Sequence, residues 1–219
     1  LNPTPATAAA RIAQQYAFNV ASTVPAFELL TAFTPSSVTV KTVTLTGGTD
    51  VVPSLTNYQT ALAIIEGIED VSIVAAPGHT EYPSLLSTDG KTSFVALELI
   101  SHAEKRRSYR IAVLDVPSAQ IVGGAKAYKG KIDSKYAALY YPWVRVLDPV
   151  TGTERDMPPS GFVAGIYARN DINRAVYKAP ANEVVVSAIG FETLLNKSQQ
   201  DVLNPEGINC FRFFEGRGF

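Results

Sequence analysis

The fold is decided by residues 71–115, which read VSIVAAPGHTEYPSLLSTDGKTSFVALELISHAEKRRSYRIAVLD. Residues 71–76 are a short apolar run ended by a Pro-Gly pair, which is typical of a buried strand, and residues 109–115 form a second such run. Between them, residues 88–107 repeat apolar side chains at helical spacing and end in basic residues, which suit the C-terminal end of a helix dipole. This order predicts a right-handed βαβ unit with parallel strands.

Further elements are predicted on both sides of this unit. Residues 57–66 repeat apolar side chains at helical spacing, and Thr56 and Gln59 have the spacing of a capping box. The remaining expected elements are a short helix at 6–17, a strand at 38–45, a helix within 118–128, a β-hairpin whose first strand is 136–147 and whose turn is 148–152, a helix at 160–169 capped by Ser160, and strands at 184–189 and 209–214.

These patterns predict an α/β fold: a mixed sheet with a parallel βαβ core flanked by helices, plus a β-hairpin and an irregular N-terminal segment. Two parts are expected along the chain. Residues 1–44 are interpreted as an N-terminal segment or the edge of a missing domain. Residues 45–219 are interpreted as the α/β core domain, truncated at its C-terminal end.

The composition argues against several classes of partner. The 219 residues carry 19 basic and 20 acidic side chains, and the longest basic run is the triplet at 105–107. A nucleic-acid surface needs a basic face that neutralises many phosphates, so no nucleic-acid partner is expected. The apolar stretches are shorter than the ~20 residues of a membrane-spanning helix, so no membrane partner is expected either.

The reactive side chains also lack the spacing of known sites. The chain has one cysteine, Cys210, and two histidines, His79 and His102, without CxxC or HExxH spacing. The glycine pairs at 47–48 and 123–124 are not followed by a phosphate-binding pattern. We therefore expect no metal and no cofactor.

Two other functions remain as alternatives. Asp115 directly follows a buried strand, where ligand-binding residues of α/β sheets tend to lie, and with His102 and Ser118 it would suit a hydrolase-like enzyme. No GxSxG elbow surrounds a serine, which favours a structural role for Asp115 and the expectation of no catalytic residue. The second alternative is a carbohydrate-binding module. It would stack sugars on an aromatic set that is equally typical of strand packing, namely Tyr136, Tyr140, Tyr141 and Trp143.

Several segments resemble the contractile tail sheath proteins of myophages and R-type pyocins, in the order in which that family has them. They are residues 137–146 (AALYYPWVRV), 158–161 (PPSG), 163–169 (VAGIYAR), 178–181 (KAPA), 201–209 (DVLNPEGIN) and 216–218 (GRG), and residues 45–50 (LTGGTD) and 75–78 (AAPG) also fit. The resemblance covers about residues 44–219.

The resemblance implies a structural subunit without an active site. Sheath proteins of this family form stacked hexameric rings around a tail tube and contract during infection. The implied partners are sister subunits, the tail tube protein and the baseplate, and the implied location is the virion, after assembly in the host cytoplasm. Family members also carry terminal arms that add strands to neighbouring subunits. These arms are not recognised in the 219 residues, so the chain by itself is expected to be monomeric.

Overall fold

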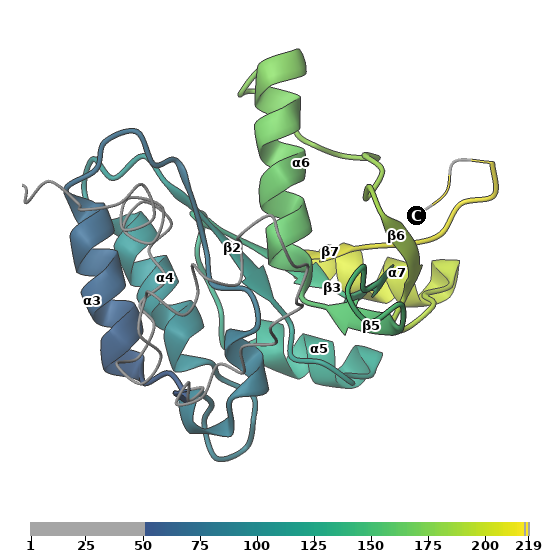
Figure 1. Ribbon diagram of the computed structural model, residues 1–219, viewed down its shortest axis with the longest axis horizontal. Helices are drawn as coiled ribbons and strands as arrows, with labels where there is room; N and C mark the ends of the chain where they lie inside the picture. Colours follow the sequence, from purple (N-terminus) through teal and green to yellow (C-terminus); the bar gives the residue numbers. More distant parts are fainter. Residues whose placement is uncertain (1–50, 217, 219) are drawn as a thin grey trace, which may run out of the picture. The chain divides into compact units, whose positions relative to one another are not determined.

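The computed structural model describes residues 51–216 and residue 218 (Figure 1). The helix predicted at 6–17, the strand predicted at 38–45 and the boundary predicted at residue 44 lie outside these residues and stay predictions.

A four-stranded parallel sheet forms the centre of the described part. Its strands, in spatial order, are β1 (Ile73–Ala75), β2 (Ile111–Asp115), β3 (Ala137–Tyr141) and β7 (Ile208–Cys210). All three neighbouring pairs are parallel. The predicted parallel pairing of residues 71–76 with residues 109–115 is therefore confirmed, with Val74 opposite Ala112.

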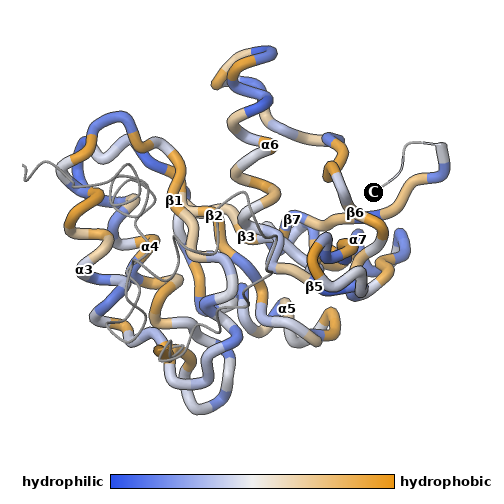
Figure 2. Tube along the Cα trace, in the orientation of Figure 1, coloured by the Kyte–Doolittle hydropathy of each residue, from blue (hydrophilic) through white to orange (hydrophobic). Residues whose placement is uncertain are grey.

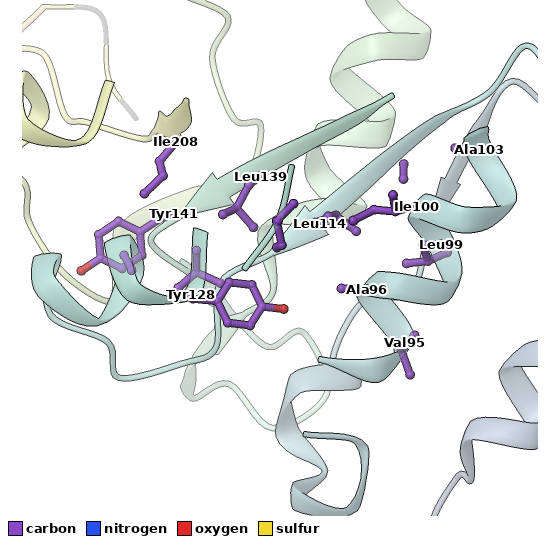
Figure 3. Packing of buried hydrophobic residues seen from close by; sticks show 14 of the residues in the cluster. Val95, Ala96, Leu99, Ile100, Ala103, Leu114, Tyr128, Leu139, Tyr141 and Ile208 are labelled. Atoms are coloured by element: carbon purple, nitrogen blue, oxygen red, sulfur yellow. The ribbon is translucent and has the colours of Figure 1, made fainter. Parts of the chain in front are cut away.

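Helices pack on both faces of this sheet because side chains alternate along β2. The helices are α3 (Leu55–Glu66), α4 (Phe94–Glu104), α5 (Val122–Lys129), α6 (Pro159–Asn173) and α7 (Lys197–Leu203). Ala112 and Leu114 lie in the same hydrophobic cluster as buried residues of α4. Asp115 instead accepts a hydrogen bond from Ser160 in α6. Figure 3 shows the α4 residues Leu99 and Ile100 gathered beside Leu114.

A second, antiparallel sheet contains the predicted hairpin. Its strands, in spatial order, are β5 (Glu154–Met157), β4 (Val144–Leu147) and β6 (Ala188–Phe191). The β4–β5 turn closes through Asp148, whose side chain accepts a hydrogen bond from the Val150 backbone N–H at 2.8 Å. The α/β class is confirmed, and its parallel and antiparallel strands belong to two separate sheets.

The prediction of one strand over residues 136–147 is wrong. Residues 137–141 belong to the parallel sheet, and residues 144–147 belong to the antiparallel one. Pro142 lies between them, joined to Tyr141 by a cis peptide bond. Proline has no backbone N–H to give to a sheet, so the apolar run is divided into two strands at this residue.

Both predicted helix caps are wrong. Helix α3 begins after Ser54, whose backbone N–H donates to the Asn57 side chain at 2.8 Å, while the Gln59 side chain donates to Glu98 of α4 instead. Helix α6 begins after Pro158, extends beyond the predicted end at residue 169, and has Ser160 inside its first turn. The side chain of Ser160 is drawn to Asp115, a tertiary partner that local spacing does not reveal.

Both C-terminal strands are displaced from their predicted bounds. The apolar run at 184–189 contributes only its last residues to β6, because Val185 packs into the core cluster of Val144, Ile166 and Phe191 from a loop. The strand predicted at 209–214 is β7, which begins at Ile208 and ends at Cys210. Figure 2 shows the apolar residues that follow β1 and β2.

Candidate functional site

Asp115 lies at the carboxyl end of β2, where the sequence placed a candidate catalytic acid. Its two carboxylate oxygens accept hydrogen bonds from Ser160, one from the backbone N–H at 2.6 Å and one from Oγ at 2.5 Å. Burial raises the pKa of Asp115 to about 7, against the lowering effect of these two bonds. Asp115 and Ser160 are both fully buried, so the carboxylate holds the first turn of α6 and has no surface at which a substrate could react.

Ser118, the candidate nucleophile, is engaged by a different residue. Its Oγ donates to Glu192 Oε1 at 2.6 Å, and the Ala119 backbone N–H donates to the same oxygen at 2.7 Å. Ala119 has a positive φ of 59°, a conformation that an L-residue adopts rarely. Glu192 therefore fastens the loop after β2 to the end of β6.

His102, the candidate base, belongs to a third group of contacts. Its Nε2 lies 2.8 Å from Arg110 Nη1, so it accepts a hydrogen bond from the guanidinium. Burial lowers the pKa of His102, and the positive charge of Arg110 lowers it further. The same guanidinium donates to the backbone carbonyls of Ile65, Ile68 and Val71.

The three candidate residues of the enzyme hypothesis therefore do not form a catalytic group. Across residues 51–216 and 218, each one is hydrogen-bonded to a different partner and none to another of the three. A nucleophile needs a base within hydrogen-bond reach, and this geometry does not supply it.

The partners of these residues are what the sequence reasoning missed. The sequence predicts Ser160 only as a helix cap and predicts no role for Glu192 or Arg110. Arg110 carried a usable signal, since a lone arginine inside an apolar strand run is expected to have buried partners. Ser160 and Glu192 carried none, because each is more than 40 residues from its partner.

Three of the four aromatic candidates are structural, whereas Tyr136 is 39% exposed and has Lys135 Nζ 5.2 Å from its ring centre. Trp143 is 3% exposed and donates from Nε1 to the Val116 carbonyl at 2.7 Å, and Tyr141 is fully buried with its hydroxyl donating to the Gln120 carbonyl at 2.6 Å. Tyr140 forms a hydroxyl pair with Tyr167 at 2.8 Å. Rings that stack on sugars must present a face to solvent, so burial of Trp143 and Tyr141 removes the basis of the carbohydrate-binding alternative.

One cavity of about 540 Å³ lies beside β7, between α6 and the segment after it. Aromatic rings form much of its wall, from Tyr140, Tyr167, Phe211 and Phe214, while Asn204 and Asn209 supply amide groups. Its size falls within the ~300–1,000 Å³ typical of binding pockets. Cys210, Glu183 and Arg212 also line it.

In the part of the chain that the structure describes, no group of three or more His, Cys, Asp or Glu residues is arranged to hold a metal ion. Among the same residues, no helix has the length and apolar character needed to cross a membrane.

Comparison with known proteins gives consistent matches. A family model described as the phage tail sheath protein central domain matches residues 54–219. The tail sheath protein of Burkholderia phage BcepMu is 32% identical over 121 residues, which cover 49% of this chain and 25% of that protein. A putative prophage major tail sheath protein of Pseudomonas aeruginosa is 30% identical over 118 residues, covering 54% of this chain and 27% of that protein. The matched segments thus span about a quarter of the length of these curated relatives.

Solved structures with a similar fold are parts of contractile assemblies. The sheath complex of the extracellular contractile injection system PVC, in the contracted state, matches with a TM-score of 0.59 and 26% identity, covering 74% of this chain and 41% of that one. The helical sheath of the anti-feeding prophage, also contracted, matches with a TM-score of 0.54 and 25% identity, covering 74% and 40%. The baseplate of the anti-feeding prophage matches with a TM-score of 0.55 and 25% identity, covering 74% and 39%.

Proposed function

This chain belongs to the phage tail sheath family, and from that premise we propose that its native polypeptide is a structural subunit of a contractile tail sheath. The observation that carries the proposal is the family match over residues 54–219, because this range contains both sheets and every helix from α3 to α7. The solved relatives support it, since they are described as contracted sheaths and as a baseplate.

In this role the subunits assemble into a helical tube of stacked hexameric rings around a tail tube, and the tube of subunits contracts during infection. The partners are sister subunits, the tail tube protein and the baseplate, without nucleic acid or membrane. The location is the tail of the virion, after assembly in the host cytoplasm. A polymer that shortens needs rigid bodies that re-pack against one another, and a two-sided α/β core of this kind is such a body.

The same proposal assigns the chain no enzymatic activity. Asp115 is fully buried, and Ser118 and His102 are held by Glu192 and Arg110. These arrangements support roles in holding loops and helices together, with no catalytic, cofactor or metal-binding residue.

Electron microscopy of the purified native polypeptide tests the proposal. We expect tubes or stacked rings with sixfold symmetry in end views. The trial should span a range of protein concentration and ionic strength, because subunit contacts of modest area assemble only above a threshold concentration. A polypeptide that stays monomeric under all these conditions would contradict the proposed function.

A further inference from the structure

The end of α6 exposes a group of large apolar side chains. Ile172, Val176 and Tyr177 are 84%, 82% and 94% exposed. We call residues 172–178 the α6 tip. In Figure 1 this end of α6 extends away from the sheet. Exposed single apolar residues are ordinary, but three of them gathered on a protrusion are typical of an interaction site.

The α6 tip is held in one conformation. The Lys178 backbone N–H donates to the Ala175 carbonyl at 3.0 Å, which makes Val176 and Tyr177 the two central residues of a turn. Asn170, only 4% exposed, donates from Nδ2 to the carbonyls of Lys178 at 2.7 Å and Ala175 at 3.4 Å. A buried asparagine thus fixes both ends of the turn that presents Tyr177.

The segment after the tip is fastened to α6 as well. Glu183 forms ion pairs with Arg169 at 3.6 Å and with Lys178 at 3.8 Å, and Arg169 also donates to the Val184 carbonyl at 3.0 Å. An aromatic residue held in a fixed, exposed position loses little conformational entropy on binding, which is the property of a binding hot spot.

The same chain has a cavity whose lining suits the apolar and aromatic side chains of the tip. The cavity of about 540 Å³ beside β7 has aromatic walls for the apolar side chains, and Asn204 and Asn209 can hydrogen-bond the Tyr177 hydroxyl. Tyr177 does not line this cavity in its own chain and is 94% exposed. The ring of Tyr177 therefore leaves the cavity of its own chain open, although Lys178 of the tip is ion-paired with Glu183 in the cavity wall.

We propose that the α6 tip of one subunit docks into the cavity beside β7 of a second copy of this chain. The inference rests on the proposed function and specifies one of its contacts. A side chain that stays outside the acceptor of its own chain and enters that of a second copy forms a heterologous contact, which repeats from copy to copy and generates rings or helical filaments. A sheath is built by repeating one subunit, so a second copy is the occupant that satisfies both surfaces.

The first experiment compares Tyr177→Ala with Tyr109→Ala in the native polypeptide. Tyr109 is also strongly exposed, at 84%, but precedes β2 and does not belong to residues 172–178, so it is a matched control. We expect Tyr177→Ala to raise the critical concentration for polymerisation at least tenfold and Tyr109→Ala to leave it within twofold. Both variants should keep the wild-type melting temperature, because neither ring is buried.

The second experiment tests the acceptor. Ala181 lines the cavity and is exposed, so Ala181→Trp should fill the cavity mouth without disturbing the core. We expect this variant to raise the critical concentration as Tyr177→Ala does, and the double variant to be no worse than either single one, since both changes remove the same contact. Fully additive effects would overturn the pairing of tip and cavity.

A photo-crosslink distinguishes a second copy from another part of the same polypeptide. Benzoylphenylalanine at position 177 is introduced into a mixture of ¹⁴N- and ¹⁵N-labelled subunits, which is polymerised and irradiated. We expect crosslinks to residues 209–214 with mixed isotopes. Crosslinks within one isotope alone, or only to residues that do not line the cavity, would overturn the proposal.

These outcomes separate the two proposals. If wild type polymerises and Tyr177→Ala polymerises equally well, the docking proposal fails while the sheath function stands. If wild type never polymerises, both fail.

Discussion

Trp143 links the end of β2 to the start of β4. Its ring is 3% exposed, and its Nε1 donates to the Val116 carbonyl. This carbonyl lies one residue beyond β2, at the point where the chain leaves the parallel sheet. The indole therefore supplies both apolar burial and a hydrogen bond between two parts of the fold.

We expect Trp143→Ala to lower the free energy of unfolding by ~3–5 kcal/mol, because it removes a buried ring and leaves the Val116 carbonyl without its donor. Trp143→Phe keeps most of the apolar burial and should cost less. Urea denaturation of the three proteins measures the difference. A Trp143→Ala protein as stable as wild type would mean that the ring is exposed and would reopen the carbohydrate-binding alternative.

Asp115 makes the stability of the chain depend on pH. Its pKa is raised to about 7 by burial, above the unfolded value of ~3.9, so the protonated form is the one that the fold favours. The stability that Asp115 contributes is then fully present below pH ~4 and is lost as the pH rises toward about 7. Above that pH no further loss is expected from this group.

The matched variant for this effect is Asp115→Asn, which keeps the shape and does not titrate. We expect the stability of wild type relative to Asp115→Asn to fall by a few kcal/mol between pH ~4 and ~7. Urea denaturation at a series of pH values gives the two curves. Parallel curves over this interval would show that the pKa of Asp115 is not raised.

At the scale of elements, α3 is attached to the rest of the domain through Arg110. The Arg110 guanidinium donates hydrogen bonds to the backbone carbonyls of Ile65, Ile68 and Val71 and to His102 Nε2. Among the described residues, none of its hydrogen bonds goes to a carboxylate. Two of these carbonyls lie at or just after the C-terminal end of α3, where the helix dipole favours a positive charge. One side chain thus joins α3, α4 and the approach to β1.

Arg110→Lys keeps the charge but has no planar fork to reach several carbonyls at once. We expect it to cost ~2–4 kcal/mol and to increase amide hydrogen exchange in α3 more than in β2 and β3. Hydrogen exchange measured by mass spectrometry resolves these segments. Lys105→Ala is the control, since it removes only an exposed ion pair with Glu66 at the same end of α3 and should change little. Equal exchange in α3 of wild type and Arg110→Lys would contradict this role.

Elements with a strong local pattern were predicted well, and elements set by distant partners were not. The βαβ unit at 71–115 and the β4–β5 hairpin follow from periodicity and turn chemistry. The separation of β3 from β4 and the shortness of β6 do not, because the same apolar residues suit either sheet or a core-packed loop. Apolar character fixes burial, while the choice of partner strand depends on packing across the whole domain.

At the scale of the whole molecule, assembly depends on how many contacts each subunit offers. One tip docked in one cavity is a single contact, whereas specific assemblies usually bury ~1,000 Å² or more in dilute solution. The matched segments of the chain cover about a quarter of the length of its curated relatives, so a native polypeptide of comparable length would add further contacts.

We therefore expect the 219-residue chain by itself to be monomeric and the native polypeptide to polymerise. Light scattering at matched concentrations measures both. Stable rings or tubes formed by the 219-residue chain would show that its own surfaces are sufficient and that the contact area argument is wrong.

The sequence by itself determined the α/β class, the central βαβ unit, the hairpin and, through the ordered segments between residues 137 and 218, the sheath family. These depend on short-range periodicity, turn residues and linear motifs, which a sequence displays directly. The tertiary structure decided that Asp115 pairs with Ser160, Ser118 with Glu192 and His102 with Arg110, and that Tyr177 stands at a fixed tip without lining the cavity. Such pairings join side chains from different elements, so they arise only when packing brings those elements together.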